Sequence, residues 1–174
     1  MLITTQNLGK TTVDELAASV GKVIPLASAY GVEMDNLSAA YAELTKGGIA
    51  TAEAGTYLKG MLRELGDSGS TVSKTLIEET GYSFAQLMQQ GYSLGDVLDV
   101  LGETVGGDAG AFNELWSSAE AGLGALSLYN AGAAQFNTTL DAMQNSIGAT
   151  EAAYATMTNA TAHSKEEMQN AAAN

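Results

Sequence analysis

The stretch from Gly47 to Gly69 constrains the fold most, because it predicts one helix with both of its ends marked. Thr51 stands where an N-cap hydroxyl can bond the first free backbone N–H groups, and Glu53 places negative charge in the first turn. Gly66 follows the last apolar residue, where a left-handed residue commonly ends a helix. One face between these ends is apolar at helical spacing: Ala54, Leu58, Met61, Leu62 and Leu65.

The residues before this stretch predict further helices. Thr12 to Glu15 forms a T-x-x-E capping box, which begins a helix whose apolar residues recur at helical spacing. Pro25 should kink or end that helix, which can resume from Leu26 to Tyr30. A second helix is predicted from Met34 to Leu44, and Gly47-Gly48 stops it.

Beyond Ser70 the helical signals are shorter. Residues 71–83 suit a short helix, although their β-branched content leaves a small hairpin open. A near-repeat, GYSF at 81–84 and GYSL at 91–94, places Ser83 and Ser93 where each can cap its own short helix. Gln86 and Asp96 would complete the two capping boxes from the N3 position.

The last third of the chain continues the pattern. Asp108 is expected to cap a helix that carries Phe112 and Trp116, and Ser117 with Glu120 forms another S-x-x-E box. A following helix is predicted from the spacing of Phe136, Leu140, Met143 and Ile147. Gly148 should end it, and Thr150 should cap a last helix toward Gln169.

These signals together predict an all-α, compact multi-helix domain with short Gly-rich turns. Typical helix lengths of roughly 11–12 residues give about seven to nine helices. Residues 1–10 lack caps and periodicity, so we expect a polar arm there. Residues 11–174 fit one helical domain, with sub-lobes at 11–66 and 70–174 as a finer division.

Composition excludes several kinds of function. Seven Lys and Arg against 20 Asp and Glu give a net charge of −13, which argues against nucleic-acid binding, because that affinity needs cations on the phosphates. The chain has no cysteine, so thiolate metal sites and cysteine nucleophiles are excluded. No segment approaches the roughly 20 continuous apolar residues that a membrane span needs.

Two short motifs resemble the surroundings of a serine nucleophile. Residues 91–95 read G-x-S-x-G, but that motif works on a strand-to-helix turn, whereas Ser93 is expected to be a helix cap. Residues 66–69 read G-D-S-G, which a helix end followed by a turn explains. The single histidine, His163, lies far along the chain in a charged segment, so a hydrolase that uses Ser93 is the least favoured hypothesis.

Metal and ligand sites are also not predicted. His163 with Glu166 and Glu167 lacks the second histidine of a zinc helix. A shared helix face carries Asp96, Asp99 and Glu103, but a solvated acidic face is the favoured interpretation. Phe112 and Trp116 are expected in the core, and the glycosylation sequons at Asn36, Asn137 and Asn159 carry no function by themselves. We therefore expect no catalytic, cofactor-binding or metal-binding residues and no enzymatic activity.

Several stretches taken in order resemble phage tail tape measure proteins of siphovirus-like phages and prophages. The resemblance runs from about Thr11 to about Asn170. It rests on 31–46, GIATAEAGTYLKGMLRELGDSGS (48–70), TGYSFAQLM (80–88), YSLGDVLDVL (92–101), FNELWSSAEAGLGALSLYNAGAAQFN (112–137) and MQNSIGATEAAYATM (143–157). Such proteins are much longer, so the resemblance implies an internal, N-terminal-side segment, with Met1 as an added start.

The resemblance implies a structural role in the virion. Tape measure proteins are helix-rich, lie inside the tail tube in several copies and set the length of the tail. The implied partners are other tape measure copies, tail tube proteins and tail assembly chaperones, with synthesis in the bacterial cytoplasm. No nucleic-acid binding, membrane span or cofactor is expected of this segment. The alternative is a stand-alone prophage-encoded helical binding or regulatory module.

Overall fold

The computed structural model describes residues 1–146, and in that range all of the regular secondary structure is helical, without a strand. An eleventh helix starts at residue 133 and continues to 146; we refer to it as the 133–146 helix. The complete helices are α1 (Leu2–Leu8), α2 (Val13–Val20), α3 (Ile24–Ala29), α4 (Met34–Lys46), α5 (Thr51–Gly66), α6 (Thr71–Thr80), α7 (Phe84–Gln89), α8 (Leu94–Thr104), α9 (Ala109–Glu114) and α10 (Ala119–Ala131).

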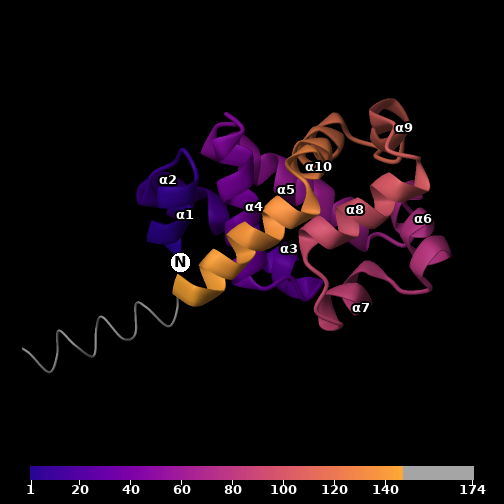
Figure 1. The fold of residues 1–174 in the computed structure, drawn as a ribbon, viewed down its shortest axis with the longest axis horizontal. Helices are drawn as coiled ribbons and strands as arrows, with labels where there is room; N and C mark the ends of the chain where they lie inside the picture. Colours follow the sequence, from indigo (N-terminus) through magenta and orange to yellow (C-terminus); the bar gives the residue numbers. More distant parts are fainter. Residues whose placement is uncertain (147–174) are drawn as a thin grey trace, which may run out of the picture.

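The all-α prediction is confirmed, and α5 is the helix around which the others pack. It contacts α2, α3, α4, α6, α7 and α10, and its apolar face is fully buried from Ala54 to Leu65. Figure 1 shows α1 and α2 at one end of the body and α6 and α9 at the other, with α5 and α10 between them. The buried side chains form one continuous core.

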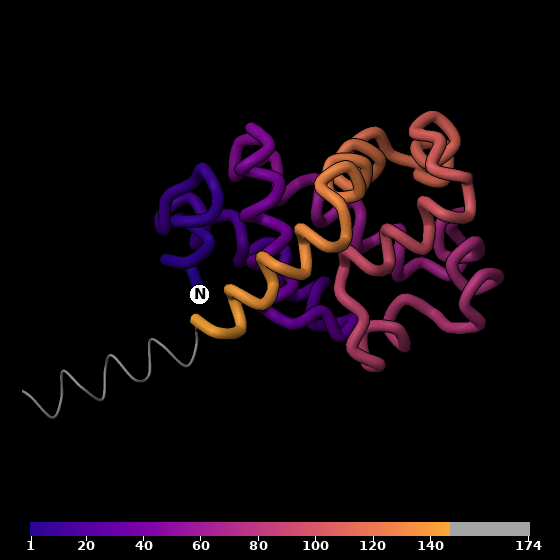
Figure 2. The backbone as a smooth tube through the Cα atoms, viewed as in Figure 1, coloured from indigo at the N-terminus to yellow at the C-terminus, as the bar shows by residue number. Residues whose placement is uncertain are grey.

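The chain returns to its beginning at the end of the described part. In Figure 2 the 133–146 helix (orange) runs back across the body, and its far end lies beside the N-terminus. The hydroxyl of Thr5 in α1 confirms this placement, because it donates to the sulfur of Met143 at 3.7 Å.

Several predicted caps form as expected. Thr12 and Glu15, Ser83 and Gln86, and Ser93 and Asp96 each make the reciprocal bonds of a capping box. Asp108 caps α9 by accepting from the N–H of Ala111 at 2.7 Å. Pro25 lies in the first turn of α3 and α2 ends earlier, at Val20, so the proline begins a helix instead of breaking one.

The prediction that Thr51 is the N-cap of α5 is wrong. Ala50 holds that position with extended backbone, and Thr51 is the first helical residue. The Thr51 hydroxyl lies 2.6 Å from that of Thr11, and its carbonyl accepts a hydrogen bond from Ser19 at 3.1 Å. The side chain therefore joins the start of α5 to the residues around α2, instead of capping its own helix.

Gly66 was predicted to end α5 in a left-handed conformation, which is also wrong. It is the last helical residue, and Asp67 follows with φ −84° in extended backbone. The glycine is required by packing, because a Cβ at this position would lie 2.0 Å from the ring of Tyr30.

The cap of α10 is displaced by one residue from its predicted position. Ser118 is the N-cap and accepts from the N–H of Ala121 at 3.3 Å, whereas Ser117 was expected there. Both serines are held by another helix, as described below.

The hairpin alternative at residues 71–83 is excluded, because Thr71–Thr80 is helix α6, capped by Ser70. Residues 1–10 are not a free arm either, since Leu2–Leu8 is helix α1 and packs against α4. The predicted helix end at Gly148 and the cap at Thr150 lie outside the described residues. The division into one domain with two sub-lobes stays a prediction.

Candidate functional site

Ser93 serves as a helix cap in the structure. It is buried at the start of α8, where its hydroxyl accepts from the N–H of Asp96 at 3.0 Å and its own N–H donates to the Asp96 carboxylate at 2.9 Å. The preceding element is the short helix α7, not a strand. In the G-D-S-G stretch, Asp67 accepts from the N–H of Gly69 at 2.9 Å and closes a turn. His163, Glu166 and Glu167 lie outside the described residues.

The acidic face of α8 does not gather a metal site. Asp96 uses both of its oxygens on protein donors, because the second accepts from the side-chain amide of Asn137 at 2.8 Å. Among residues 1–146, no three His, Cys, Asp or Glu side chains meet in a way that could hold a metal ion. Phe112 and Trp116 pack in the core as predicted, with ring centroids 6.2 Å apart.

The most concentrated polar contact in the described part is made by Glu64 of α5. Its carboxylate accepts four hydrogen bonds from the linker between α9 and α10, two from the backbone N–H groups of Ser117 and Ser118 and two from their hydroxyls. The four distances lie between 2.7 and 2.9 Å. Because these two amides have no backbone acceptor in the structure, Glu64 supplies the bonds that this linker cannot make for itself.

These contacts also decide the ionisation of Glu64. Burial alone would raise its pKa, but the four donors of Ser117 and Ser118 favour the ionised form more strongly, so the pKa lies below the ordinary value of 4.5. The carboxylate is therefore charged at neutral pH and is stabilised by four neutral donors. Its chemistry is that of an anchor, not of a general acid or base.

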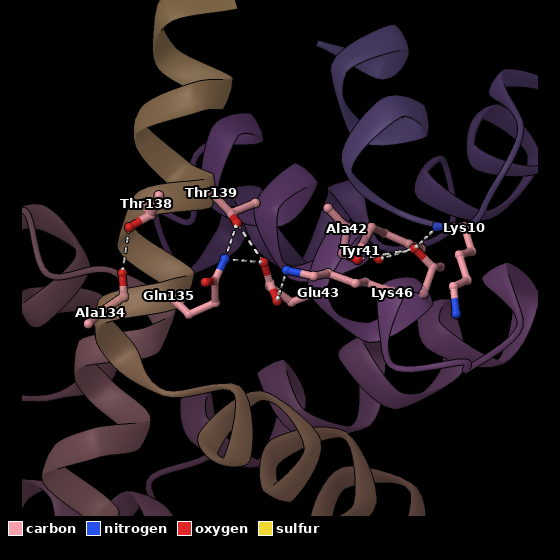
Figure 3. A network of polar contacts seen from close by, with 10 residues as sticks. Lys10, Tyr41, Ala42, Glu43, Lys46, Ala134, Gln135, Thr138 and Thr139 are labelled. Atoms are coloured by element: carbon pink, nitrogen blue, oxygen red, sulfur yellow. Dashed lines mark hydrogen bonds and ion pairs between the residues drawn. The ribbon is translucent and has the colours of Figure 1, made fainter.

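A second set of carboxylates joins the 133–146 helix to the body. Glu43 of α4 accepts hydrogen bonds from Thr139 at 2.5 Å and from Gln135 at 3.4 Å, and Lys46 lies 3.8 Å from its other oxygen. Figure 3 shows Glu43 between the two helices, with Gln135 and Thr139 on one side and Lys46 on the other. Glu43 is buried, whereas a glutamate in a helix interior is usually exposed.

Two further carboxylates extend this line of contacts. Asp35, at the start of α4, accepts from Gln144 at 2.7 Å, and Asp96 of α8 accepts from Asn137. We call the whole set the polar seam. It pairs body carboxylates with neutral side chains of the 133–146 helix: Asp35 with Gln144, Glu43 with Thr139 and Gln135, and Asp96 with Asn137.

Apolar side chains dock the same helix beside the polar seam. Phe136, Leu140 and Met143 are buried at helical spacing. Phe136 lies directly on Gly95 of α8, where an added Cβ would come within 2.8 Å of the phenylalanine Cβ. The helix is therefore positioned both by shape and by a specific set of hydrogen bonds.

A groove of about 470 Å³ lies between α2 and α5. Small side chains and Ser19 line it, and Lys22 and Lys59 stand at its rim with Glu15. Ser19 is already engaged, because its hydroxyl lies 2.9 Å from that of Tyr41 and also donates to the Thr51 carbonyl. The Ser19 hydroxyl is therefore committed to structural hydrogen bonds.

Sequence reasoning missed the anchoring role of Glu64, Glu43 and Asn36. The side-chain oxygen of Asn36 accepts from the N–H of Leu94, 58 positions along the chain, at 3.0 Å. No local pattern marks such residues, because a single helical acidic or amide residue is ordinarily taken as solvated.

The contacts described above join helices and linkers, and they do not form a catalytic group of side chains. Within residues 1–146, the helices are also too short or too polar for a bilayer crossing.

Comparison with known proteins gives a consistent assignment. Residues 1–101 match the family model described as phage-related minor tail protein. The chain is 35% identical over 165 residues to a probable tape measure protein of Clostridium phage phiCD119, and the alignment covers 91% of this chain and 18% of that protein. No solved structure matches the chain. The chain therefore belongs to the phage-related minor tail protein family and is a structural protein of a phage tail.

Proposed function

We propose that this chain contributes to tail assembly and to the determination of tail length, as a segment of a tape measure protein. The observation that carries the proposal is the 35% identity to a probable tape measure protein over 91% of the chain. Because the chain spans only 18% of that protein, length control would belong to a longer polypeptide of which this fold is one part.

The contacts of the described residues support a non-enzymatic role. Glu43, Glu64 and Asp96 are bound to donors from other parts of the fold, so these acidic groups are committed to structure. The partners we propose are other copies of the tape measure protein, tail tube proteins and tail assembly chaperones. The site of action would be the interior of the virion tail, after synthesis in the bacterial cytoplasm, and the net charge of −13 disfavours DNA as a partner of this segment.

The contribution of residues 1–146 to tail length depends on whether they stay folded in the tail. A compact unit of 146 residues is about 40 Å across, from a radius of gyration of about 15 Å. The same residues drawn out as one helix would span about 220 Å at about 1.5 Å per residue. The two states therefore make different predictions for the same change in the gene.

The test is an in-frame deletion of codons 11–146 in the phage or prophage that encodes the chain, with tail lengths measured by electron microscopy. If the segment measures as an extended helix, tails shorten by about 200 Å, whereas a body that stays folded shortens them by only about 40 Å. A tandem duplication of the same codons is the companion variant and should lengthen tails by the matching amount. Normal tails of unchanged length in both variants would contradict the proposal.

A further inference from the structure

Gly132 is the only residue between α10 and the 133–146 helix. Its backbone has φ 86° and ψ 143°, a conformation that residues other than glycine rarely adopt. A Cβ at this position would meet nothing within 4 Å, so conformation and not space requires the glycine. The chain bends between α10 and the 133–146 helix, which turns back onto the body (Figure 1).

If Gly132 took helical angles instead, residues 119–146 would form one uninterrupted helix. Its 28 residues would be about 42 Å long, and its second half would leave the body. The buried stripe of Phe136, Leu140 and Met143 would then be exposed, and Asp35 and Glu43 would lose the donors that this helix supplies. If an equivalent helix docks on α4 and α8 instead, the apolar side chains are buried again and the two carboxylates regain their donors.

We propose that two copies of this chain exchange their 133–146 helices, each docking on α4 and α8 of the other. A straightened Gly132 would connect α10 of one copy to its helix on the second copy. Exchange of identical elements reproduces every native contact at little cost, and the hinge here is a single residue. This inference does not depend on the proposed role in tail-length determination.

The occupant is a second copy because the polar seam is matched to this helix in composition and register. Asp35 meets Gln144 and Glu43 meets Thr139, so α4 and the 133–146 helix run antiparallel with paired positions. The helix carries one charged residue in 133–146, Asp141, which is exposed, so docking adds no further carboxylate to the seam. An unrelated acidic helix would meet repulsion from the same carboxylates.

The first experiment is Gly132→Ala in the 174-residue chain, with mass measured by light scattering after size exclusion. Alanine disfavours the bend and favours helix over glycine by about 1 kcal/mol, so we expect the dimer dissociation constant to fall at least about fivefold per hinge. Gly91→Ala is the matched control, because Gly91 also has positive φ (90°) and open space around its Cβ but lies between α7 and α8. That variant should keep the dimer dissociation constant of the parent chain.

The second experiment identifies which surfaces meet and does not rely on the hinge variant folding well. The chain has no cysteine, so Lys46→Cys and Gln135→Cys can be placed on separate chains, at exposed positions on the two sides of the Glu43 contact. The two variants are mixed, warmed, cooled and treated with a short bismaleimide. A covalent heterodimer supports exchange, and a double variant in one chain is the positive control.

Either of two results would overturn the proposal. One is that no heterodimer cross-link forms under conditions in which the double variant reacts fully. The other is that Gly132→Ala gives dimers in which mixed Lys46→Cys and Gln135→Cys chains do not cross-link, because those dimers would then use another surface.

Discussion

Replacing Glu64 with alanine should weaken the fold more than the replacement of an exposed carboxylate. The change removes the acceptor of four hydrogen bonds from Ser117 and Ser118. The two hydroxyls can turn toward water, but the two backbone N–H groups stay in the partly buried linker without an acceptor. Because Ser118 also caps α10 through the N–H of Ala121, loss of the anchor loosens the start of that helix as well.

The magnitude follows from these groups. An unpaired amide costs about 1–3 kcal/mol, and the low end applies here because Ser117 is exposed and Ser118 is half-buried, so we expect Glu64→Ala to lower the free energy of unfolding by about 2 kcal/mol. That is a large share of the roughly 5–15 kcal/mol of a typical domain. Glu64→Gln keeps one oxygen acceptor and should lose about half as much.

Urea unfolding followed by fluorescence measures this effect directly. The single tryptophan, Trp116, immediately precedes the two serines, so its emission reports on the linker that Glu64 holds. Glu78→Ala on α6 is the matched control, because Glu78 is exposed and should change stability by less than about 0.5 kcal/mol. If Glu64→Ala were no more costly than Glu78→Ala, the anchoring role of this carboxylate would be refuted.

The pH dependence provides a second readout of the same residue. Its pKa is lower in the folded than in the unfolded protein, so its stabilisation is fully present above the ordinary value of 4.5 and is lost as pH falls through the folded-state pKa. The stability difference between the parent chain and Glu64→Gln should therefore shrink on acidification from neutral pH. A difference that stays constant down to about pH 3 would contradict this reasoning.

Three further changes test other contacts. Gly66→Ala should cost about 1–3 kcal/mol by forcing a methyl group into the ring of Tyr30, and much less in a Tyr30→Ala background, with urea unfolding as the measure. Ser93→Ala should cost about 1 kcal/mol as a lost cap. A fluorophosphonate probe should leave Ser93 of the parent chain unlabelled, and labelling would revive the hydrolase hypothesis. Burial raises the pKa of Tyr41 despite its hydrogen bond with Ser19, so the parent chain should lose stability above pH 10, the ordinary value, as the tyrosine ionises. Tyr41→Phe should remove that part of the alkaline loss, and equal loss in both chains would contradict it.

The sequence predicted most of the helix beginnings, because capping chemistry is local. Ser83 with Gln86 and Ser93 with Asp96 are three residues apart, and the same backbone geometry that begins a helix brings them together. The apolar face of α5 was equally visible, since its spacing follows the helical period. These features need no knowledge of the rest of the chain.

The errors arose where a distant partner decides the role of a residue. At Ser117 and Ser118 two adjacent hydroxyls could have capped α10, and the carboxylate of Glu64, more than 50 positions earlier, fixes both. Gly66 looked like a helix end, but the approach of Tyr30 requires it. Helix α1 has no side-chain cap, so no local signal marked it and an arm was predicted. Its packing against α4 stabilises the helix.

The polar seam was invisible for the same reason. Glu43 lies 96 positions from Thr139 and resembles an ordinary helical glutamate until the 133–146 helix covers it. We expected no catalytic residues because the sequence offers Ser93 neither a strand-to-helix turn nor a nearby histidine. The resemblance to tape measure proteins rested on long stretches taken in order. Neither depended on finding the anchors.

Side chains of remote helices bond the backbone of the linkers and helix starts. Amide hydrogen exchange by NMR tests it at three N–H groups that have no backbone acceptor, those of Leu94, Ser117 and Ser118. We expect protection close to that of the α5 core at all three, and loss of protection at the two serines in Glu64→Ala. Exchange of these amides in the parent chain at the rate of an unstructured peptide would contradict it.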